Sequence, residues 1–569
     1  MHISTSSRGM TLIDVLVGSA LVLIIFLALM GLLRASIAIS SLAKARAGAS
    51  SLSESQMEYL RGISYDSLGT IGGIPSGLVP PTQIKKLNNI AYTMHTYIQY
   101  VDSPADGLGV NDTNGITADY KVAKISVDYQ AGGSSHSAVL VSNFSPPSIE
   151  TTNGGGTLTI HVVNATGAPV PGATVHITDP ALTPAIDMSA FSNTLGIVSL
   201  PGAPVSSDYQ IKVTKSGYSS AQTYVRDTTN QNPTPGYLTV VKEQITAGTF
   251  AIDTLASFTL HTYNPISSDS LFDTFTDQSL LSATSSVSVS SGEITLAGTA
   301  LSGSARSITV TPTMLHAWTS VQASTAASSG SSVLAHVYTA GNTLLPDSVL
   351  PGNSTGFSTF PIDLTNVSTS TYPTLAVGAT LSRTGTSIVP KVFNWSLAYD
   401  TGPTPLPNVP FTLTGEKTIG STGAGASIYK TILSTTTNAS GQRALPLEWD
   451  SYSIGVTGYN IEGACPLPPY PLAPGSVNTA SLTLVAPTAN TLLVNVQDSS
   501  GAPVSDVTVT LTNTGYSSAV SSSTCAGAYF GGLSSSDTYT VTISKGGYTT
   551  TTSNNISVSG QTFYTATFQ

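Results

Sequence analysis

The chain has 569 residues, only 9% of them charged, and a net charge of −10. The usual size of about 100–200 residues per domain predicts three to five domains, and the charged fraction is far below the roughly 25% of ordinary soluble domains. The 20 lysines and arginines are scattered along the sequence, which excludes nucleic acid from the expected partners.

A nearly continuous apolar run covers residues 12–33, directly after a short polar leader that ends in Arg8-Gly9. One acid, Asp14, interrupts it near its start. An acid in hydrocarbon costs a few kcal/mol unless it is paired. The run therefore predicts a membrane-inserted or bundled helix in which Asp14 has a partner.

This arrangement of Gly9, Met10, Thr11, Leu12, Ile13 and Asp14 resembles the class III signal of type IV prepilins and pseudopilins. The resemblance implies that a prepilin peptidase cuts between Gly9 and Met10 and that Met10 is then N-methylated. It also implies that the Asp14 carboxylate pairs with the new N-terminal amine of a neighbouring subunit during assembly. The chain departs from the usual family pattern by having Met10 where Phe is common and Asp14 where Glu is common. The alternative is an ordinary signal peptide or signal anchor.

Helical sequence continues beyond the apolar run. Residues 34–60 contain no proline and are rich in Ala, Ser and Leu, so we expect one helix from Met10 to about Leu60. At 1.5 Å per residue it would be about 75 Å long. Half would lie in a membrane or filament core, and half would pack under a β-domain, as in pilins. Alternating patterns predict the strands of that domain at 91–100, 120–129 and 137–142.

Four acids fall in the segment between the first two of these strands. Asp102, Asp106, Asp112 and Asp119 form a candidate calcium site, because carboxylate oxygens are preferred calcium ligands. Their spacing matches no EF-hand, and the alternative is a solvated acidic loop.

A repeat follows the glycines at 154–156. Gly-Ala-Pro-Val occurs at 167–170 and again at 501–504, and Lys-x-Gly-Tyr occurs at 215–218 and 545–548. A degenerate copy lies between them, around 407–413 and 452–459. These segments resemble the carboxypeptidase regulatory-like or Cna-B-like family of immunoglobulin-type sandwiches, which implies a separate β-sandwich for each copy.

Residues 250–400 follow a different pattern, with short strands separated by Ser, Thr and Gly loops. They predict a jelly-roll or lectin-like sandwich. Trp318 and Trp395 within it are either sugar-stacking platforms or core residues, and the core interpretation is favoured.

The chain has two cysteines, Cys465 and Cys525. Exported β-domains with two cysteines usually pair them, so we expect a disulfide between the last two sandwiches. Two unrelated buried thiols are the alternative.

Catalytic motifs are nearly absent from the sequence. There is no Walker loop, HExxH or CxxC, and the one G-x-S-x-G match, at 352–356, lies in a Pro/Gly loop without a strand–helix context. We therefore expect neither enzymatic activity nor a cofactor.

The expected fold is mainly β, with a long N-terminal α-helix and a small pilin-type sheet followed by a string of Ig-like and jelly-roll β-sandwiches. The expected segments are 1–9 (leader), 10–62 (helix), 63–148 (pilin-type head), 149–248 (first regulatory-like sandwich), 249–402 (jelly-roll), 403–488 (degenerate regulatory-like sandwich) and 489–569 (C-terminal sandwich).

The leading hypothesis is a minor pilin or pseudopilin-like subunit of a type IV pilus or type II secretion-like filament that displays β-sandwiches for surface adhesion. Its partners would be the prepilin peptidase, other pilin subunits, membrane lipid and a surface ligand of unknown identity. It would cross the bacterial cytoplasmic membrane once, with the C-terminal part outside, at the cell surface or in a pilus. The alternatives are a membrane-anchored stalk that does not polymerise and an extracellular glycan-acting enzyme.

Overall fold

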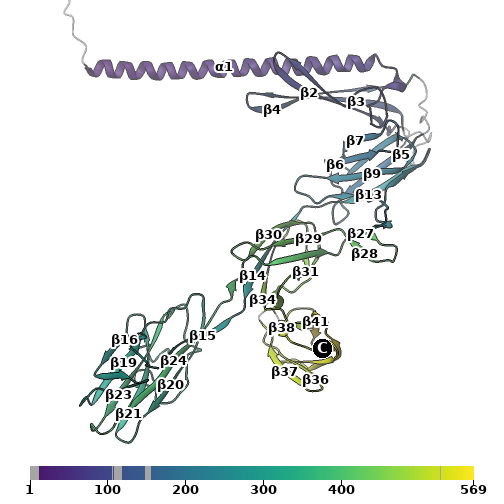
Figure 1. Cartoon of the computed structure of the whole chain (residues 1–569). Helices are drawn as coiled ribbons and strands as arrows, with labels where there is room; N and C mark the ends of the chain where they lie inside the picture. The colour runs from purple at the N-terminus through teal and green to yellow at the C-terminus, as the bar shows by residue number, and fades with distance from the viewer. Residues whose placement is uncertain (1–11, 106, 108–117, 148–154, 524, 526) are drawn as a thin grey trace, which may run out of the picture. The chain divides into compact units, whose positions relative to one another are not determined.

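The computed structural model describes residues 12–105, 107, 118–147, 155–523, 525 and 527–569 (Figure 1). It confirms the expected fold class, because one long helix is followed by many β-strands that form sandwiches. Packing divides the chain into two compact units, Met1–Leu255 with Lys417–Lys430, and Ala256–Glu416 with Thr431–Gln569.

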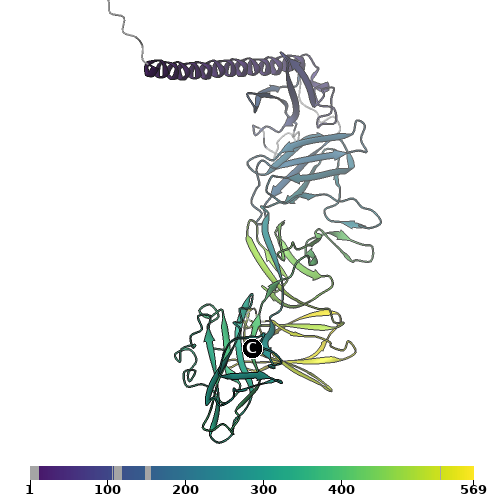
Figure 2. The same ribbon diagram turned by 60° about the vertical axis from the view of Figure 1, so that its left-hand side comes forward.

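The first unit begins with helix α1 (Leu12–Arg61), in agreement with the predicted helix, and a short 3-10 turn, η1 (Tyr65–Ser67). An antiparallel sheet of order β1-β2-β3-β4 lies along the C-terminal part of α1 (Figures 1 and 2). Its strands are β1 (Thr82–Leu87), β2 (Ile90–Val101), β3 (Tyr120–Ala131) and β4 (Ser134–Phe144). Burial alternates along β2 and β3, so one face of the sheet covers the helix.

Small residues allow α1 and this sheet to approach closely. The side chains of Ala45 and Ala49 are fully buried, and the Tyr92 hydroxyl donates a hydrogen bond to the Ala45 carbonyl over 3.1 Å. A Cβ at Gly48 would lie 2.6 Å from that hydroxyl. Met57 and Leu60 complete the buried stripe of the helix.

Lys121 connects the turn η1, which follows α1, to strand β3. Its side chain is buried, and its ammonium donates a 2.6 Å hydrogen bond to the carbonyl of Tyr65. The same ammonium lies 4.4 Å from the ring centroid of Tyr65 and 4.8 Å from that of Tyr100. Two aromatic faces and a carbonyl thus replace the water that a buried ammonium loses.

The first sandwich, also in this unit, consists of two sheets. One has the order β13-β5-β8, and the other has the order β10-β9-β6-β7 with β12 also paired to β9. Their strands are β5 (Gly156–Val163), β6 (Thr174–Asp179), β7 (Ile186–Phe191), β8 (Ile197–Ala203), β9 (Ser206–Thr214), β10 (Ala221–Gln222), β12 (Leu238–Val240) and β13 (Ile245–Ala251). A short strand β11 (Asn232–Pro233) pairs with the hairpin β27 (Thr418–Ser421) and β28 (Ser427–Tyr429).

A Gly-rich loop anchors the head to the first sandwich. Ile74 in this loop is fully buried within the core cluster of the sandwich. The Gly72 carbonyl accepts a 2.8 Å hydrogen bond from the Asp187 amide. Gly202 has a φ of 73°, and a Cβ at that position would lie 2.7 Å from the Tyr100 ring. The head and the first sandwich therefore share packed surfaces within one unit.

The second unit contains the third sandwich, which begins at β14 (Ala256–Asn264). This strand pairs in parallel with β34 (Val477–Val485) and antiparallel with β30 (Gln442–Leu447). The same sheet contains β25 (Thr404–Pro405) and β32 (Asn460–Cys465), and the facing sheet has the order β29-β26-β31-β33. The strands of the facing sheet are β26 (Pro410–Gly415), β29 (Ile432–Thr436), β31 (Asp450–Val456) and β33 (Tyr470–Leu472).

The predicted jelly-roll boundary at residue 249 falls inside strand β13. Strand β13 closes the first sandwich, and β14 contributes Phe258 and Leu260 to the core of the third. The jelly-roll is therefore an insertion between β14 and β25 rather than a separate link in a linear string. Alternation of apolar residues identifies a strand but does not say which sheet receives it, and the partners of β14 lie far along the sequence.

The inserted sandwich packs two sheets. One has the order β17-β18-β24-β20-β22 with β15 also paired to β24, and the other has the order β16-β19-β23-β21. Their strands are β15 (Ser267–Asp273), β16 (Leu281–Ser285), β17 (Val287–Ser290), β18 (Glu293–Leu296), β19 (Ser302–Ser307), β20 (Leu315–Ala326), β21 (Ser331–Thr339), β22 (Ile362–Asp363), β23 (Leu375–Arg383) and β24 (Lys391–Thr401).

The C-terminal sandwich repeats the topology of the first. Its last strand pairs in parallel with its first, as β13 does with β5 and β34 does with β14. The two sheets have the orders β38-β35-β41 and β37-β36-β39-β40. The strands are β35 (Thr491–Gln497), β36 (Thr508–Asn513), β37 (Tyr516–Ser521), β38 (Gly527–Phe530), β39 (Thr538–Ser544), β40 (Thr551–Ser557) and β41 (Gln561–Thr567).

Ile74, which anchors the Gly-rich loop, allows a test of how much this contact stabilises the first sandwich. Ile74→Ala should lower the opening free energy of the first sandwich by about 2–5 kcal/mol, because it removes buried methyl groups and leaves a cavity. Hydrogen exchange of β5 and β9 amides measures this loss. Ile71→Ala is the matched control, because Ile71 lies in the same loop but is 48% exposed and should change the value by under about 0.5 kcal/mol. Equal exchange in the two variants would contradict the anchoring role.

Candidate functional site

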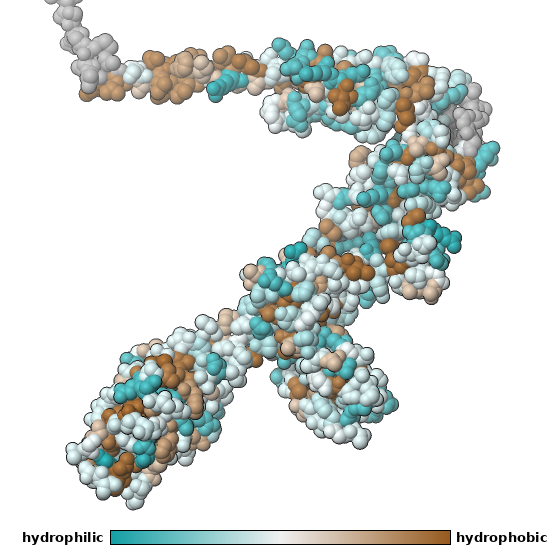
Figure 3. All heavy atoms as spheres, in the orientation of Figure 1, coloured by the Kyte–Doolittle hydropathy of each residue, from teal (hydrophilic) through white to brown (hydrophobic). Residues whose placement is uncertain are grey.

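The N-terminal part of α1 is the most unusual surface of the described residues. Every described side chain from Ile13 to residue 44 is exposed, although most of those up to Leu33 are large and apolar. Ile13 is 70% exposed and Ile39 is 69% exposed. Hydrophobic residues cover the visible face of this part of the helix (Figure 3). A soluble protein rarely exposes an apolar surface of this extent, so this segment needs an apolar environment.

The dimensions of the segment fit a bilayer. At 1.5 Å per residue, residues 13–33 extend about 30 Å, which equals the thickness of the hydrocarbon core. Within the described part of the chain, α1 is the one helix long and apolar enough to cross a membrane, judged by length and composition.

Two serine hydroxyls in the exposed part of α1 are bonded within the helix. The Ser19 hydroxyl donates to the Leu16 carbonyl over 2.9 Å, and the Ser41 hydroxyl donates to the Ala38 carbonyl over 2.8 Å. Such internal bonds are what hydrocarbon requires, because no water is available there. The segment can therefore lie in lipid or in a bundle of similar helices.

The residues of the predicted processing site are only partly described. Gly9 and Met10 lie outside the described residues. Asp14 lies in the first described turn of α1, and nothing is described of its side chain. A carboxylate in the first turn of a helix is favoured by the helix dipole, and in the sequence Asp14 is the only acid between Met10 and Leu33.

The candidate calcium loop is also only partly described. Asp106 and Asp112 lie outside the described residues. Asp119 accepts a 2.5 Å hydrogen bond from the Ser103 amide, which places its carboxylate at the neck of the loop. In the ranges that the structure describes, no group of three or more metal-ligating side chains occurs. The calcium hypothesis therefore stays a prediction.

The G-x-S-x-G match forms a structural loop. The Ser354 hydroxyl and amide both donate to the Asp347 carboxylate, and these bonds hold the Asp347 pKa below its usual range. The neighbouring Asn353 side chain is fully buried and donates to the carbonyls of Val337 and Leu345. Among the hydrogen bonds of the described residues, none joins Ser354 to a histidine. The Ser354 hydroxyl is therefore part of the hydrogen bonding that holds this loop.

Both tryptophans of the inserted sandwich belong to its core. Trp318 is 0% exposed and Trp395 is 1% exposed, and the Trp318 indole donates a 2.8 Å hydrogen bond to the Tyr372 carbonyl. Trp395 packs edge-on against Phe275 with 4.9 Å between the ring centroids. Neither ring can stack on a sugar, and the core interpretation is confirmed.

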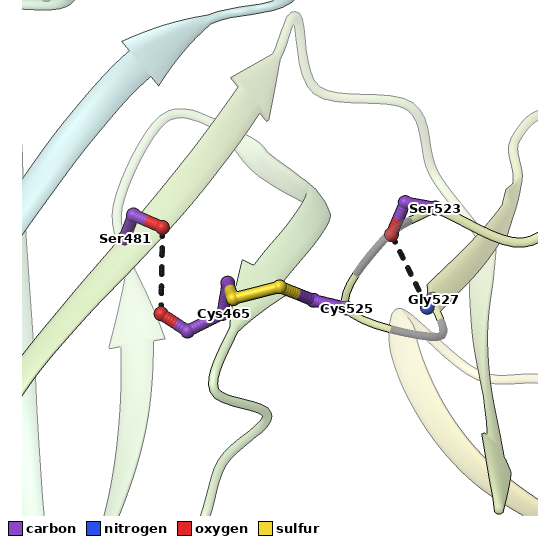
Figure 4. Close-up of a disulfide and its surroundings, with 5 residues drawn as sticks. All are labelled: Cys465, Ser481, Ser523, Cys525 and Gly527. Carbon is purple, nitrogen blue, oxygen red and sulfur yellow. Dashed lines mark hydrogen bonds between the residues drawn. A yellow bond between two sulfur atoms is a disulfide. The ribbon is translucent and has the colours of Figure 1, made fainter. Parts of the chain in front are cut away.

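The two cysteines are joined by a disulfide (Figure 4). Cys465 ends strand β32 of the third sandwich, and Cys525 precedes β38 of the C-terminal sandwich. Direct contacts accompany the bond. Leu493 of β35 is fully buried in the core cluster of the third sandwich, and the Gln561 amide donates a 2.9 Å hydrogen bond to the Ile461 carbonyl. The disulfide thus closes an interface that is already packed.

Comparison with known proteins supports part of this description. Residues 157–260 match the family model of the carboxypeptidase regulatory-like domain, which agrees with the resemblance of the first sandwich. A search of curated proteins found no match.

A comparison with solved structures returned matches that include the following three. The Bacillus anthracis TIE protein is 10% identical, with 86% of this chain and 73% of that chain covered and a TM-score of 0.15. BcpA, the major pilin subunit of Bacillus cereus, is 9% identical, with 73% and 99% covered and a TM-score of 0.13. The full-length major pilin SpaD from Corynebacterium diphtheriae is 11% identical, with 74% and 99% covered and a TM-score of 0.13.

Removal of the disulfide should loosen the C-terminal pair of sandwiches. The bond closes a span of 60 residues, and in the loop-entropy model it contributes roughly 4 kcal/mol. The double variant Cys465→Ser/Cys525→Ser should therefore unfold at lower temperature than the parent without reductant. With reductant, the parent should fall to the temperature of the variant, which should not change. Free-thiol labelling of both cysteines in exported, non-reduced protein would contradict the pairing.

Proposed function

We propose that this chain is a minor pilin or pseudopilin-like subunit of a type IV pilus or type II secretion-like filament, and that it displays its β-sandwiches for surface adhesion. One observation carries the proposal: α1 is exposed and apolar over its N-terminal part and packed under a small sheet from Ala45 onward. A subunit that moves from a bilayer into a filament needs a helix with two such parts. The lipid or the filament core covers the exposed N-terminal part, whereas the subunit's own sheet covers the part from Ala45 onward.

Processing would convert the membrane-inserted precursor into the assembly-competent form. In this proposal the prepilin peptidase cuts between Gly9 and Met10, and the new amine of Met10 is methylated. The apolar segment keeps the chain in the cytoplasmic membrane through contact with lipid, with the C-terminal part outside. The amine is a positive charge that exists only after the cut.

Assembly would then depend on the charge of Asp14. In a low-dielectric bundle, a terminal amine needs a nearby anion, because an unpaired charge there is strongly unfavourable. Asp14 supplies this anion to the amine of a neighbouring subunit. Asp is one methylene shorter than the Glu that is common in the family, so the two helices must approach correspondingly closer.

The sandwiches favour a sparse or terminal position in the filament. Four sandwiches follow the head in each subunit, and a helical shaft built only of such subunits would be crowded. A minor subunit has room for them. Their low charge leaves surfaces of hydroxyl and amide groups, which suits contact with surface ligands outside the cell.

A membrane-anchored stalk that never polymerises is the second candidate. The exposed apolar helix fits a simple anchor equally well. The two functions differ in Asp14, because an anchor gains nothing from an acid in its apolar segment, whereas a filament subunit needs one.

The mature protein should begin at Met10 and carry an N-methyl group. Intact mass and N-terminal sequencing of protein from membrane or sheared-filament fractions measure this directly. Gly9→Val should leave the leader attached, whereas Gly18→Ala, which meets no atom within 4 Å, should be processed normally. A chain that starts at Met1, or a cut after Leu33, would refute the prepilin signal.

Asp14→Asn should leave cleavage intact but reduce the amount of protein in sheared filaments. The amine would remain without its anion, and loss of one partner of a desolvated pair costs about 3–5 kcal/mol. The membrane fraction should rise in parallel, because an uncharged segment is a better anchor. Blots of both fractions provide the measurement.

Asp14→Glu is the matched control for this experiment, because it keeps the charge and restores the residue common in the family. It should assemble at least as well as the parent. If the Asn variant and the parent enter the sheared fraction equally, Asp14 has no role in assembly and the stalk becomes the better description.

A further inference from the structure

One sheet of the first sandwich carries a row of polar side chains on its outer face. The strand register places His176 of β6 opposite Lys212 of β9, and Lys212 opposite Gln222 of β10. Thr178 and Gln210 form the neighbouring pair of the same two strands. Because residues two apart on a strand share a face, these side chains form one continuous polar floor.

Two tyrosines, Tyr224 and Tyr237, lie beside this floor. Tyr224 and Tyr237 begin and end a long excursion of the chain, and together with the floor they line a groove of about 430 Å³. The Tyr224 amide donates a 2.9 Å hydrogen bond to the Pro235 carbonyl, and Tyr224 forms a β-bridge with Gly236. The two ends of the excursion are thus held together through their backbones.

The excursion is also fixed at its far end. Asp227 accepts hydrogen bonds from the amides of Thr229 and Asn230, over 2.8 and 2.7 Å. The Asn230 side-chain amide donates a 3.0 Å hydrogen bond to the Ile419 carbonyl of β27. The wall of the groove is therefore preorganised, which reduces the entropy lost on binding.

The lining of the groove contains one lysine, Lys212, and one histidine, His176. The His176 imidazole is 2.7 Å from the Asp187 carboxylate, so that acid is already engaged. Within the part of the chain that the structure describes, no acid lies within salt-bridge distance of the Lys212 ammonium. The floor thus presents, between amide and hydroxyl groups, a lysine ammonium that forms no ion pair among the described residues.

We propose that this groove binds a polysaccharide that contains uronic acids. The inference rests on the adhesive function proposed above and names the class of ligand. A sugar carboxylate pairs with Lys212, ring hydroxyls bond to the amides of Gln210 and Gln222, and an apolar sugar face packs on Tyr224 or Tyr237. Amphipathic rings with a polar rim suit sugars for this reason. The groove is open at the surface, so a polymer can pass through it.

The test is binding of purified full-length protein, in detergent, to immobilised polygalacturonate, alginate and hyaluronan. At least one of these should bind, and the binding should weaken with added salt because a charge pair is screened. Lys212→Gln and Tyr237→Ala should each reduce that affinity at least tenfold. Lys85→Gln is the matched control, because Lys85 is an exposed lysine on β1 of the head, and it should bind as the parent does. Melting curves verify that the variants are folded.

A second arm separates the carboxylate from the rest of the sugar. Polygalacturonate whose carboxyl groups have been reduced to alcohols should lose most of its binding to the parent. The proposal is overturned if none of the three polymers binds, if the reduced polymer binds equally well, or if Lys212→Gln and Tyr237→Ala both bind like the parent. Failure of filament assembly in the Asp14 experiment leaves this measurement untouched, because binding by the purified chain does not require a filament.

Discussion

The apolar surface of α1 is the constraint on which the proposed function of this protein depends. Residues 13–33 present large aliphatic side chains to the surroundings, and burial of such a side chain contributes about 1.5–3 kcal/mol. Exposure of the whole segment to water is therefore unfavourable. The same helix changes character at Ala45, where small residues let the sheet β1–β4 cover it. One continuous helix thus presents an apolar surface at its N-terminal end and packs against the folded head at its C-terminal end.

A different constraint applies to the first, third and C-terminal sandwiches. In each of them the last strand of the repeat pairs in parallel with the first strand. Strands β13, β34 and β41 pair with β5, β14 and β35, respectively. Because this closure joins the two ends of each repeat, the connections between strands can lengthen without breaking the fold. The third sandwich shows the extreme case, since a complete two-sheet domain occupies the connection after β14. Loop-closure entropy grows slowly with length, and a folded insert with its own core adds little to it.

Only 9% of the residues are charged, and three of these charged residues have different roles. Lys121 is buried between two aromatic rings and holds the turn η1 to the head. Asp227 shapes the excursion beside the groove of the first sandwich. Lys212 is exposed within that groove and has no acid at salt-bridge distance among the described residues. A charge without a local structural partner is the kind that recognition uses, whereas the other two stabilise the fold.

Local sequence determined a large part of this protein. The absence of proline and the run of apolar residues indicate α1, two-residue alternation indicates β2, β3 and β4, and the repeated Gly-Ala-Pro-Val segments indicate two of the sandwiches. The pairing of two cysteines has only one solution. These features are local or unique, so they can be recognised without knowledge of the partner segment.

Tertiary structure alone decided which segments meet. The sequence does not show that β14 belongs with strands nearly 190 and 220 residues later, or that Ile74 of the head enters the core of the first sandwich. Nor does it align His176, Lys212 and Gln222 in one row. Alternation and turn residues set the conformation of a segment through its own backbone. The choice of neighbouring strand depends on packing between residues far apart in the chain. Many strands rich in β-branched residues have the same alternating pattern, so the pattern does not select one partner.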